Sequence, residues 1–270
     1  MPENKSLVGQ VIDQSGGVLE KAYDDLAHPT AKSVGNTLSL VPRTIGVWLG
    51  KWEKWIINGE ESIRLTAQAV EQKAAIIPEE KLTEPDAYVA IPAIQQLSYC
   101  YDSEVLRDMY ANLLVSSMNI DKKSQVHPSF VDIIKQMTPD EAKLLQVLPK
   151  TSVSYSPLVD LQVNLGNGRG HVCLLRNYTT LGDAVCELPG NICSYIDNLD
   201  RLKIIRVIEE VRLMNGDRYH EMENSPFLLA HKNVQIGDGQ SFSIKRKSFV
   251  VTEFGTAFIT TCVSPESSNN

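Results

Sequence analysis

The spacing of apolar residues changes once along this 270-residue chain, and that change constrains the fold more than any other feature. Before Pro149, apolar residues recur at steps of three and four, which is the period of an amphipathic helix. Residues 59–77 are the clearest case, with Ile63, Val70 and Ile77 on one face. After Pro149, alternating and β-branched stretches indicate short strands. The sequence therefore predicts a mainly α protein with a smaller α+β part, in which a second domain follows an N-terminal helical bundle.

One strong helix start marks the expected domain boundary. Thr138-Pro139-Asp140-Glu141 combines a capping hydroxyl, a proline at the first helical position and a glutamate at the capping-box position. We therefore assign residues 1–137 to the helical domain and residues 138–263 to the second domain. Residues 264–270 should form a disordered tail, because chain ends fray unless something anchors them.

The order of elements after residue 138 resembles a winged helix. A turn at Gly166-Asn167-Gly168 separates two short strands, and a helix over 189–202 precedes a strand at 204–207. A turn at Asn215-Gly216-Asp217 would close a hairpin, before a strand at 248–251 and a last helix opened by Thr252. Winged helices often read DNA with a helix in the major groove, and many others contact proteins, so this order alone does not fix a function.

All three tryptophans lie in one amphipathic segment, residues 30–57, at positions 48, 52 and 55. The segment keeps helical spacing, and Pro42 should bend or divide the helix. An amphipathic hairpin packed into a helical core is the first interpretation. A second is an interfacial element in which Trp48, Trp52 and Trp55 form a membrane or partner surface.

No pattern of catalytic residues stands out. His127 is the most suggestive polar residue, because histidine titrates near neutral pH, but a loop histidine that caps the next helix explains it as well. The cysteines lack the close pair typical of zinc sites, and the glycine-rich turn lacks the lysine of a phosphate loop. We therefore expect no cofactor, no metal site and no enzymatic activity.

Charge offers one candidate nucleic-acid surface. The formal net charge is −7, so the whole molecule does not favour polyanions. Within residues 138–270, however, basic residues gather in two places, and phosphate contacts need such cations on one face. The candidate residues are Arg201, Lys203, Arg206 and the run Lys245, Arg246 and Lys247. Glutamates between these residues weaken the positive electrostatic potential. A solvated charged surface that binds no nucleic acid is the alternative interpretation.

Composition indicates the compartment. The five cysteines are odd in number and irregularly spaced, which argues against a disulfide framework. We see no secretory signal and no apolar run of the ~18 residues that a spanning helix needs. The chain is expected to be cytoplasmic, with membrane association on activation as a further expectation.

Several phrases resemble one bacterial family of unknown function, the Abi-alpha (abortive infection alpha) family. They are Tyr23-Asp24-Asp25-Leu26-Ala27, Ile77-Pro78-Glu79-Glu80-Lys81-Leu82, Met109-Tyr110-Ala111-Asn112-Leu113-Leu114, Ser116-Ser117-Met118 and His127-Pro128-Ser129-Phe130. The likeness spans roughly residues 15–265 and is densest from 77 to 148. It implies a phage-defence role and brings no established active site.

Three functions follow from these observations. The first is a defence protein that acts by binding and conformational change rather than by catalysis. The second is a winged-helix transcriptional regulator, and the third is an unrecognised nuclease or other hydrolase. The expected partner is a protein or a nucleic acid, with peripheral membrane contact and homo-oligomerisation as further possibilities.

Overall fold

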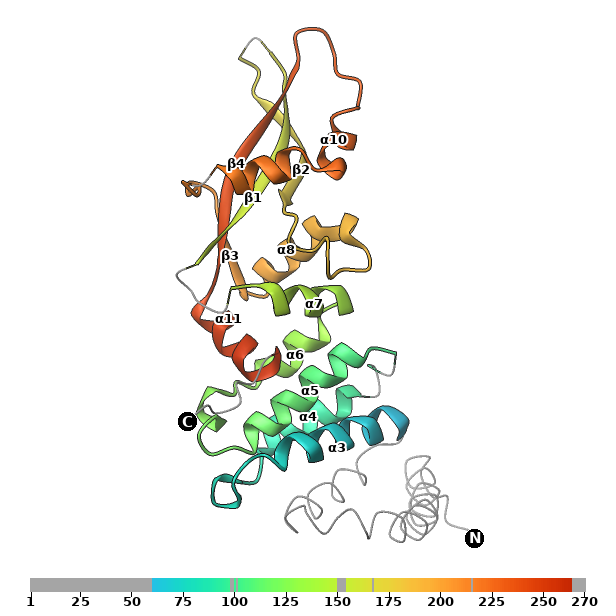
Figure 1. Cartoon of the computed structure of the whole chain (residues 1–270), viewed down its shortest axis with the longest axis vertical. Helices are drawn as coiled ribbons and strands as arrows, with labels where there is room; N and C mark the ends of the chain where they lie inside the picture. Colours follow the sequence, from blue (N-terminus) through green and yellow to red (C-terminus); the bar gives the residue numbers. More distant parts are fainter. Residues whose placement is uncertain are drawn as a thin grey trace, which may run out of the picture.

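The structure, a computed structural model, describes residues 60–97, 100, 102–149, 154–166, 168–214 and 216–263. Within these residues the fold is mixed α+β, and the molecule is elongated, with helices at one end and a sheet at the other (Figure 1). The helical end contains α3 (Glu60–Ala74), η2 (Glu79–Lys81), α4 (Ala87–Leu97), α5 (Glu104–Ser117), η3 (Lys123–Gln125), α6 (Ser129–Lys135) and α7 (Pro139–Val147).

The remaining elements build the sheet and its covering helices. They are β1 (Tyr155–Asn164), β2 (His171–Tyr178), η4 (Pro189–Asn191), α8 (Ile192–Arg201), β3 (Ile205–Ile208), α9 (Asp217–Glu223), α10 (Pro226–His231), β4 (Ser241–Val251), α11 (Glu253–Phe258) and the π-helical segment η5 (Ile259–Val263). The strand order is β2-β1-β4-β3, and all three pairings are antiparallel. β2 and β3 therefore form the two edges of the sheet.

Local signals explain where the helices begin. The Thr138 side chain accepts a hydrogen bond from the Glu141 backbone N–H, while the Glu141 carboxylate accepts one from the Thr138 N–H, so the capping box is complete. The Ser103 and Thr252 hydroxyls cap α5 and α11 in the same way. The starts at Thr138 and Thr252 confirm the sequence predictions, because a cap depends on residues that lie next to each other in the chain.

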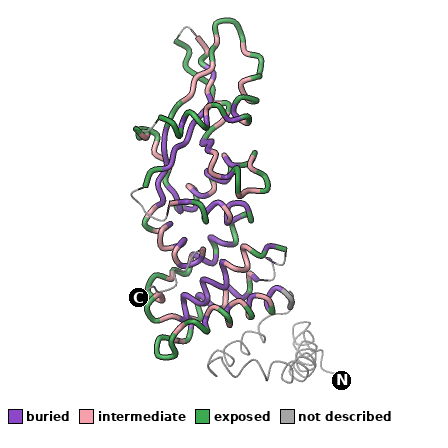
Figure 2. Tube along the Cα trace, viewed as in Figure 1, coloured by how far each residue is buried: buried purple, intermediate pink, exposed green. Residues whose placement is uncertain are grey.

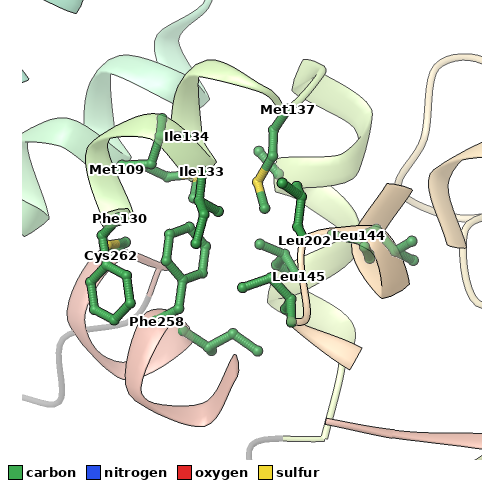
Figure 3. Packing of buried hydrophobic residues seen from close by; sticks show 14 of the residues in the cluster. Met109, Phe130, Ile133, Ile134, Met137, Leu144, Leu145, Leu202, Phe258 and Cys262 are labelled. Atoms are coloured by element: carbon green, nitrogen blue, oxygen red, sulfur yellow. The ribbon is translucent and has the colours of Figure 1, made fainter. Parts of the chain in front are cut away.

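One hydrophobic core joins the two ends of the molecule. Figure 3 shows the junction, where Phe130 and Ile133 of α6 face Phe258 of α11, and Leu145 of α7 approaches Leu202 at the end of α8. All five side chains are buried, and burying a side chain of this size contributes about 1.5–3 kcal/mol. The predicted division at residue 138 stays a prediction, since the core crosses it without a break.

The end of the described chain returns to the helical end. The Asn112 amide of α5 donates to the Cys262 carbonyl at 2.9 Å, and the Ser116 hydroxyl donates to the Thr261 carbonyl at 3.0 Å. Both acceptors belong to the π-helical segment η5. Lys73 of α3 completes this network, because its Nζ lies 2.7 Å from Asp108 and donates to the Asn112 Oδ1.

The expected hairpin turn at 215–217 is wrong. The chain forms α9 and α10 between β3 and β4, so a long helical excursion joins these paired strands. By contrast, the turn between β1 and β2 is confirmed: Gly166, Gly168 and Gly170 have φ values of 71–87°, which glycine adopts without strain. The winged-helix likeness stays a prediction.

Candidate functional site

The far halves of two strands are largely exposed. Exposed and half-buried residues dominate the far ends of β2 and β4, whereas β1 between them stays mostly buried (Figure 2). In β2, residues 171–176 are exposed or half-buried, and only Asn177 and Tyr178 are buried. Because β2 is an edge strand, one of its long sides pairs with no strand among the residues that the structure describes.

The backbone of β2 presents hydrogen-bonding groups on that open side. The Leu165 N–H donates to the Gly170 carbonyl at the start of the hairpin, and hydrogen-bonded and non-hydrogen-bonded pairs alternate along an antiparallel ladder. The register pairs His171 with Asn164 and Cys173 with Gln162. It follows that the N–H and C=O groups of His171 and Cys173 face away from β1.

Two apolar side chains accompany this open edge. Val172 is 48% exposed and Leu174 is 39% exposed. Edge strands are usually blunted by charges, prolines or bulges, and the register shifts of the β1–β2 pair lie beyond Gln162, toward the buried end of β2. The register of β2 is thus regular over residues 171–173, and Leu174 is the extra residue where it shifts. A short, partly apolar edge of this kind can accept an added strand.

A buried ion cluster supports the sheet beneath this edge. Lys247 of β4 has no exposed surface, and its Nζ lies 2.7 Å from Asp160 of β1 and 3.1 Å from Glu209, which follows β3. Asp160 also accepts a hydrogen bond from the backbone N–H of Asn177 in β2 at 2.8 Å. Asn177 has a φ of 60°, a conformation that non-glycine residues rarely adopt. The cluster therefore links all four strands.

The basic run at 245–247 does not form one cationic face. Successive side chains of a strand point to opposite faces, so Lys245 and Lys247 share one face and Arg246 lies on the other. Lys245 pairs with Glu209 at 2.5 Å, and Arg246 donates two hydrogen bonds to Glu223, at 2.5 and 3.0 Å. A phosphate would have to displace these carboxylates, and it could reach the buried Lys247 only if the sheet opened.

The other three predicted cations lie around the C-terminal end of α8. Arg201 is exposed and donates to the Asn198 Oδ1 and the Gln136 Oε1. Lys203 and Arg206 are also exposed, and neither side chain has a hydrogen-bond or ion-pair partner among the described residues. These two are the predicted cations that remain available to a ligand.

His127 precedes α6 and bonds to its first residue. Its Nδ1 accepts a hydrogen bond from the Ser129 backbone N–H at 3.2 Å, at the start of α6. The ring also lies 6.0 Å from that of Phe130 and 5.8 Å from that of Phe254. His127 therefore helps to join α6 to α11.

Four of the five cysteines are poor nucleophiles. Burial raises the pKa of Cys100 to about 11 and that of Cys193 to about 12, and it raises the pKa of Cys186 and Cys262 as well. These four thiols stay protonated at neutral pH, whereas thiol chemistry needs the thiolate. Within the described ranges, no group of three or more His, Cys, Asp or Glu side chains is arranged to hold a metal ion.

Asp140 holds the loop before α8 against the helical end. Its carboxylate accepts hydrogen bonds from the backbone N–H groups of Glu187 and Leu188, at 2.9 and 2.8 Å, and from the Tyr195 hydroxyl at 3.1 Å. Burial acts to raise the pKa of Asp140, but these bonds outweigh it and the pKa lies below its usual value. This clamp fixes α8 and the loop before it to α7.

Sequence reasoning missed the clamp, the ion cluster and the open edge. An acidic residue in the first turn of a helix gave Asp140 a local explanation, and the partners of Lys247 lie far away in the sequence. The predicted surface of Trp48, Trp52 and Trp55 lies outside the described residues. In the part of the chain that the structure describes, no helix is long and apolar enough to cross a membrane.

Comparisons with known proteins place the chain in context. A family model described as "Abortive infection alpha" matches residues 58–262. No curated protein matches. An uncharacterized protein from the hydrocarbon-degrading marine bacterium Alcanivorax borkumensis SK2 matches among solved structures, with 20% identity and a TM-score of 0.34. That match covers 53% of this chain and 94% of the other, and at this score it carries no argument.

Proposed function

Because the chain belongs to the abortive infection alpha family, we propose that it is a bacterial phage-defence protein that acts by binding a partner rather than by catalysis. The open edge of β2 carries this proposal. It offers unpaired backbone groups beside Val172 and Leu174, on a sheet that the Lys247 cluster makes rigid. An extended segment of a partner protein would pair with this edge as an added strand.

A rigid edge favours binding because little conformational entropy is lost when the partner binds. Main-chain hydrogen bonds supply affinity in strand addition, and the side chains along the strand supply selectivity. In this proposal, occupancy of the edge is the event that triggers defence, and the helical end transmits it. The core shared by α6, α7 and α11 is the physical connection between the two.

The test places charge on the edge. The double substitution Val172→Lys and Leu174→Lys should abolish strand addition, since lysine on an edge strand opposes pairing with another chain. The matched control is Val211→Lys with Val234→Lys, because these residues are 37% and 54% exposed and lie outside the strands. Survival of bacteria that express each variant would be measured during phage challenge.

We expect the edge variant to lose protection and the control variant to keep it, with both folded by circular dichroism. Full protection by a folded edge variant would refute the proposal. Electrophoretic mobility of the protein with its own upstream DNA, at several salt concentrations, tests the winged-helix regulator. A salt-sensitive shift that Lys203→Ala with Arg206→Ala removes would favour that function instead.

A further inference from the structure

A small cleft lies where β2 ends, beside the start of α10. Its volume is about 220 Å³, and its lining residues are Tyr178, Asp183, Pro189, Gly190, Ser225, Pro226 and Phe227. Sites for cofactors and drug-sized ligands usually measure about 300–1,000 Å³. The volume of this cleft therefore suits one amino-acid side chain rather than a cofactor.

The walls of the cleft are mainly apolar and well supported. The rings of Tyr178 and Phe227 stack with centroids 5.2 Å apart. The buried Tyr178 hydroxyl bonds to the Ser225 hydroxyl at 2.9 Å, and Ser225 in turn caps α10 through the Leu228 N–H. Pro189 and Pro226 add rigid apolar surface. These contacts hold the cleft open without a ligand.

One carboxylate in this cleft is uncompensated. The side-chain carboxylate of Asp183, an exposed residue, has no hydrogen-bond or ion-pair partner among the residues that the structure describes. Burial raises the pKa of Asp183, and the negative charge of Glu221 raises it further. Both causes disfavour the ionised carboxylate. A cation placed beside Asp183 would stabilise that ionised form against both.

We infer that the cleft binds the side chain of a lysine or arginine from a partner protein. The aliphatic stem lies against Pro189, Pro226 and Phe227, and the charged end meets Asp183. Long basic side chains combine an apolar stem with a cationic tip in this way. The inference rests on the proposed binding function, because it states the chemistry of the partner close to the edge strand.

The experiment uses the full chain and single-residue probes. Nα-acetyl-lysine amide and Nα-acetyl-arginine amide are titrated, with Nα-acetyl-norleucine amide as the uncharged comparison, and backbone amide shifts are followed by NMR. We expect saturable shifts at Gly190 and Phe227 for a basic probe and none for norleucine. Asp183→Asn should weaken binding at least ~tenfold, which corresponds to ~1.4 kcal/mol.

Two further variants make the test sharp. Gly190→Ala adds a Cβ only 3.6 Å from Phe227, an ordinary contact that fits the fold while narrowing the cleft, so it should weaken both basic probes. Asp238→Asn removes an exposed carboxylate that does not line the cleft, and it should bind as the parent does. Equal binding of norleucine, or parental affinity in Asp183→Asn, would overturn the inference.

The probes also separate this inference from the proposed function. Protection that needs the β2 edge, together with probes that do not bind, would refute the cleft alone. Specific probe binding together with protection that ignores the β2 edge would refute the proposed trigger while leaving the cleft established.

Discussion

Gly255 is the position at which the structure makes its sharpest energetic prediction. A Cβ added there would lie 1.9 Å from the Ile204 carbonyl oxygen, whereas such atoms almost never approach within 3.0 Å. The Ile204 carbonyl cannot retreat easily, since it accepts a hydrogen bond from the Thr252 N–H at 3.0 Å. Gly255→Ala must therefore move α11 away from the start of β3 by about 1 Å or more.

The cost can be estimated from its parts. Overpacking costs about 1–3 kcal/mol, and each weakened hydrogen bond at this helix start costs about 1 kcal/mol. Alanine regains about 1 kcal/mol over glycine within a helix. We expect a net loss of about 2–4 kcal/mol, which lowers the Tm of a fold of this size by roughly 5–15 °C.

Thermal melts followed by circular dichroism would measure this loss. Gly216→Ala is the matched control, because its added Cβ meets no atom within 4 Å and its φ is −69°. Its unfolding free energy should stay within about 0.5 kcal/mol of the parent value. A Tm for Gly255→Ala within roughly 2 °C of the parent would refute this reasoning, because it would show that α11 can move away from β3 at little energetic cost.

Two further predictions concern buried charges. Lys247→Met should lower the free energy of unfolding, measured in urea, by about 3–5 kcal/mol, because it leaves Asp160 buried without its cation. Adding Asp160→Leu should recover part of that loss. If the losses of the two single variants simply added in the double variant, the pairing would be contradicted. The pKa of Asp140 is lowered in the folded protein. The ionised carboxylate therefore contributes fully to stability above pH ~4, and this contribution is lost as the pH falls through the folded-state pKa. Asp140→Asn should thus lower the free energy of unfolding at pH 7 and make it fall less steeply between pH 4 and pH 2. A variant whose stability falls with acid as steeply as that of the parent would contradict the role of Asp140.

Features that depend on neighbouring residues could be predicted from the sequence. The caps at Thr138 and Thr252 predicted helix starts, because the capping hydroxyl and the N–H group that donates to it lie within three residues. The glycine turn between β1 and β2 was predictable for the same reason. The family is confirmed as well, since its phrases are local strings of residues.

Features that depend on strand order could not be predicted. The cations at 245–247 look like one cluster in the sequence, but the two-residue period of a strand divides them between opposite faces. The carboxylates that bind Lys247 lie 87 and 38 positions away, a separation that no local pattern encodes. Likewise, α9 and α10 have only seven and six residues, too few for a clear helical period.

The candidate surfaces were hidden for a related reason. Val172 and Leu174 are unremarkable apolar residues in a predicted strand, and they matter only because β2 is at the edge of the sheet. Asp183 stands in a loop, and its isolation depends on which charges the fold brings near it. Exposure and the lack of an ionic partner are properties of the assembled molecule.

The loop before α8 connects the cleft to the helical end in a few covalent steps. Pro189 and Gly190 line the cleft, and the two preceding residues donate their backbone N–H groups to Asp140 at the start of α7. A basic side chain that draws Asp183 inward would pull on the same loop, whose other end is held by the Asp140 carboxylate. Since α7 packs into the core shared with α6 and α11, a change in the cleft has a packed route to the helical end. Transmission by this route would require two discrete arrangements of the loop, with the Asp140 hydrogen bonds made in one and broken in the other.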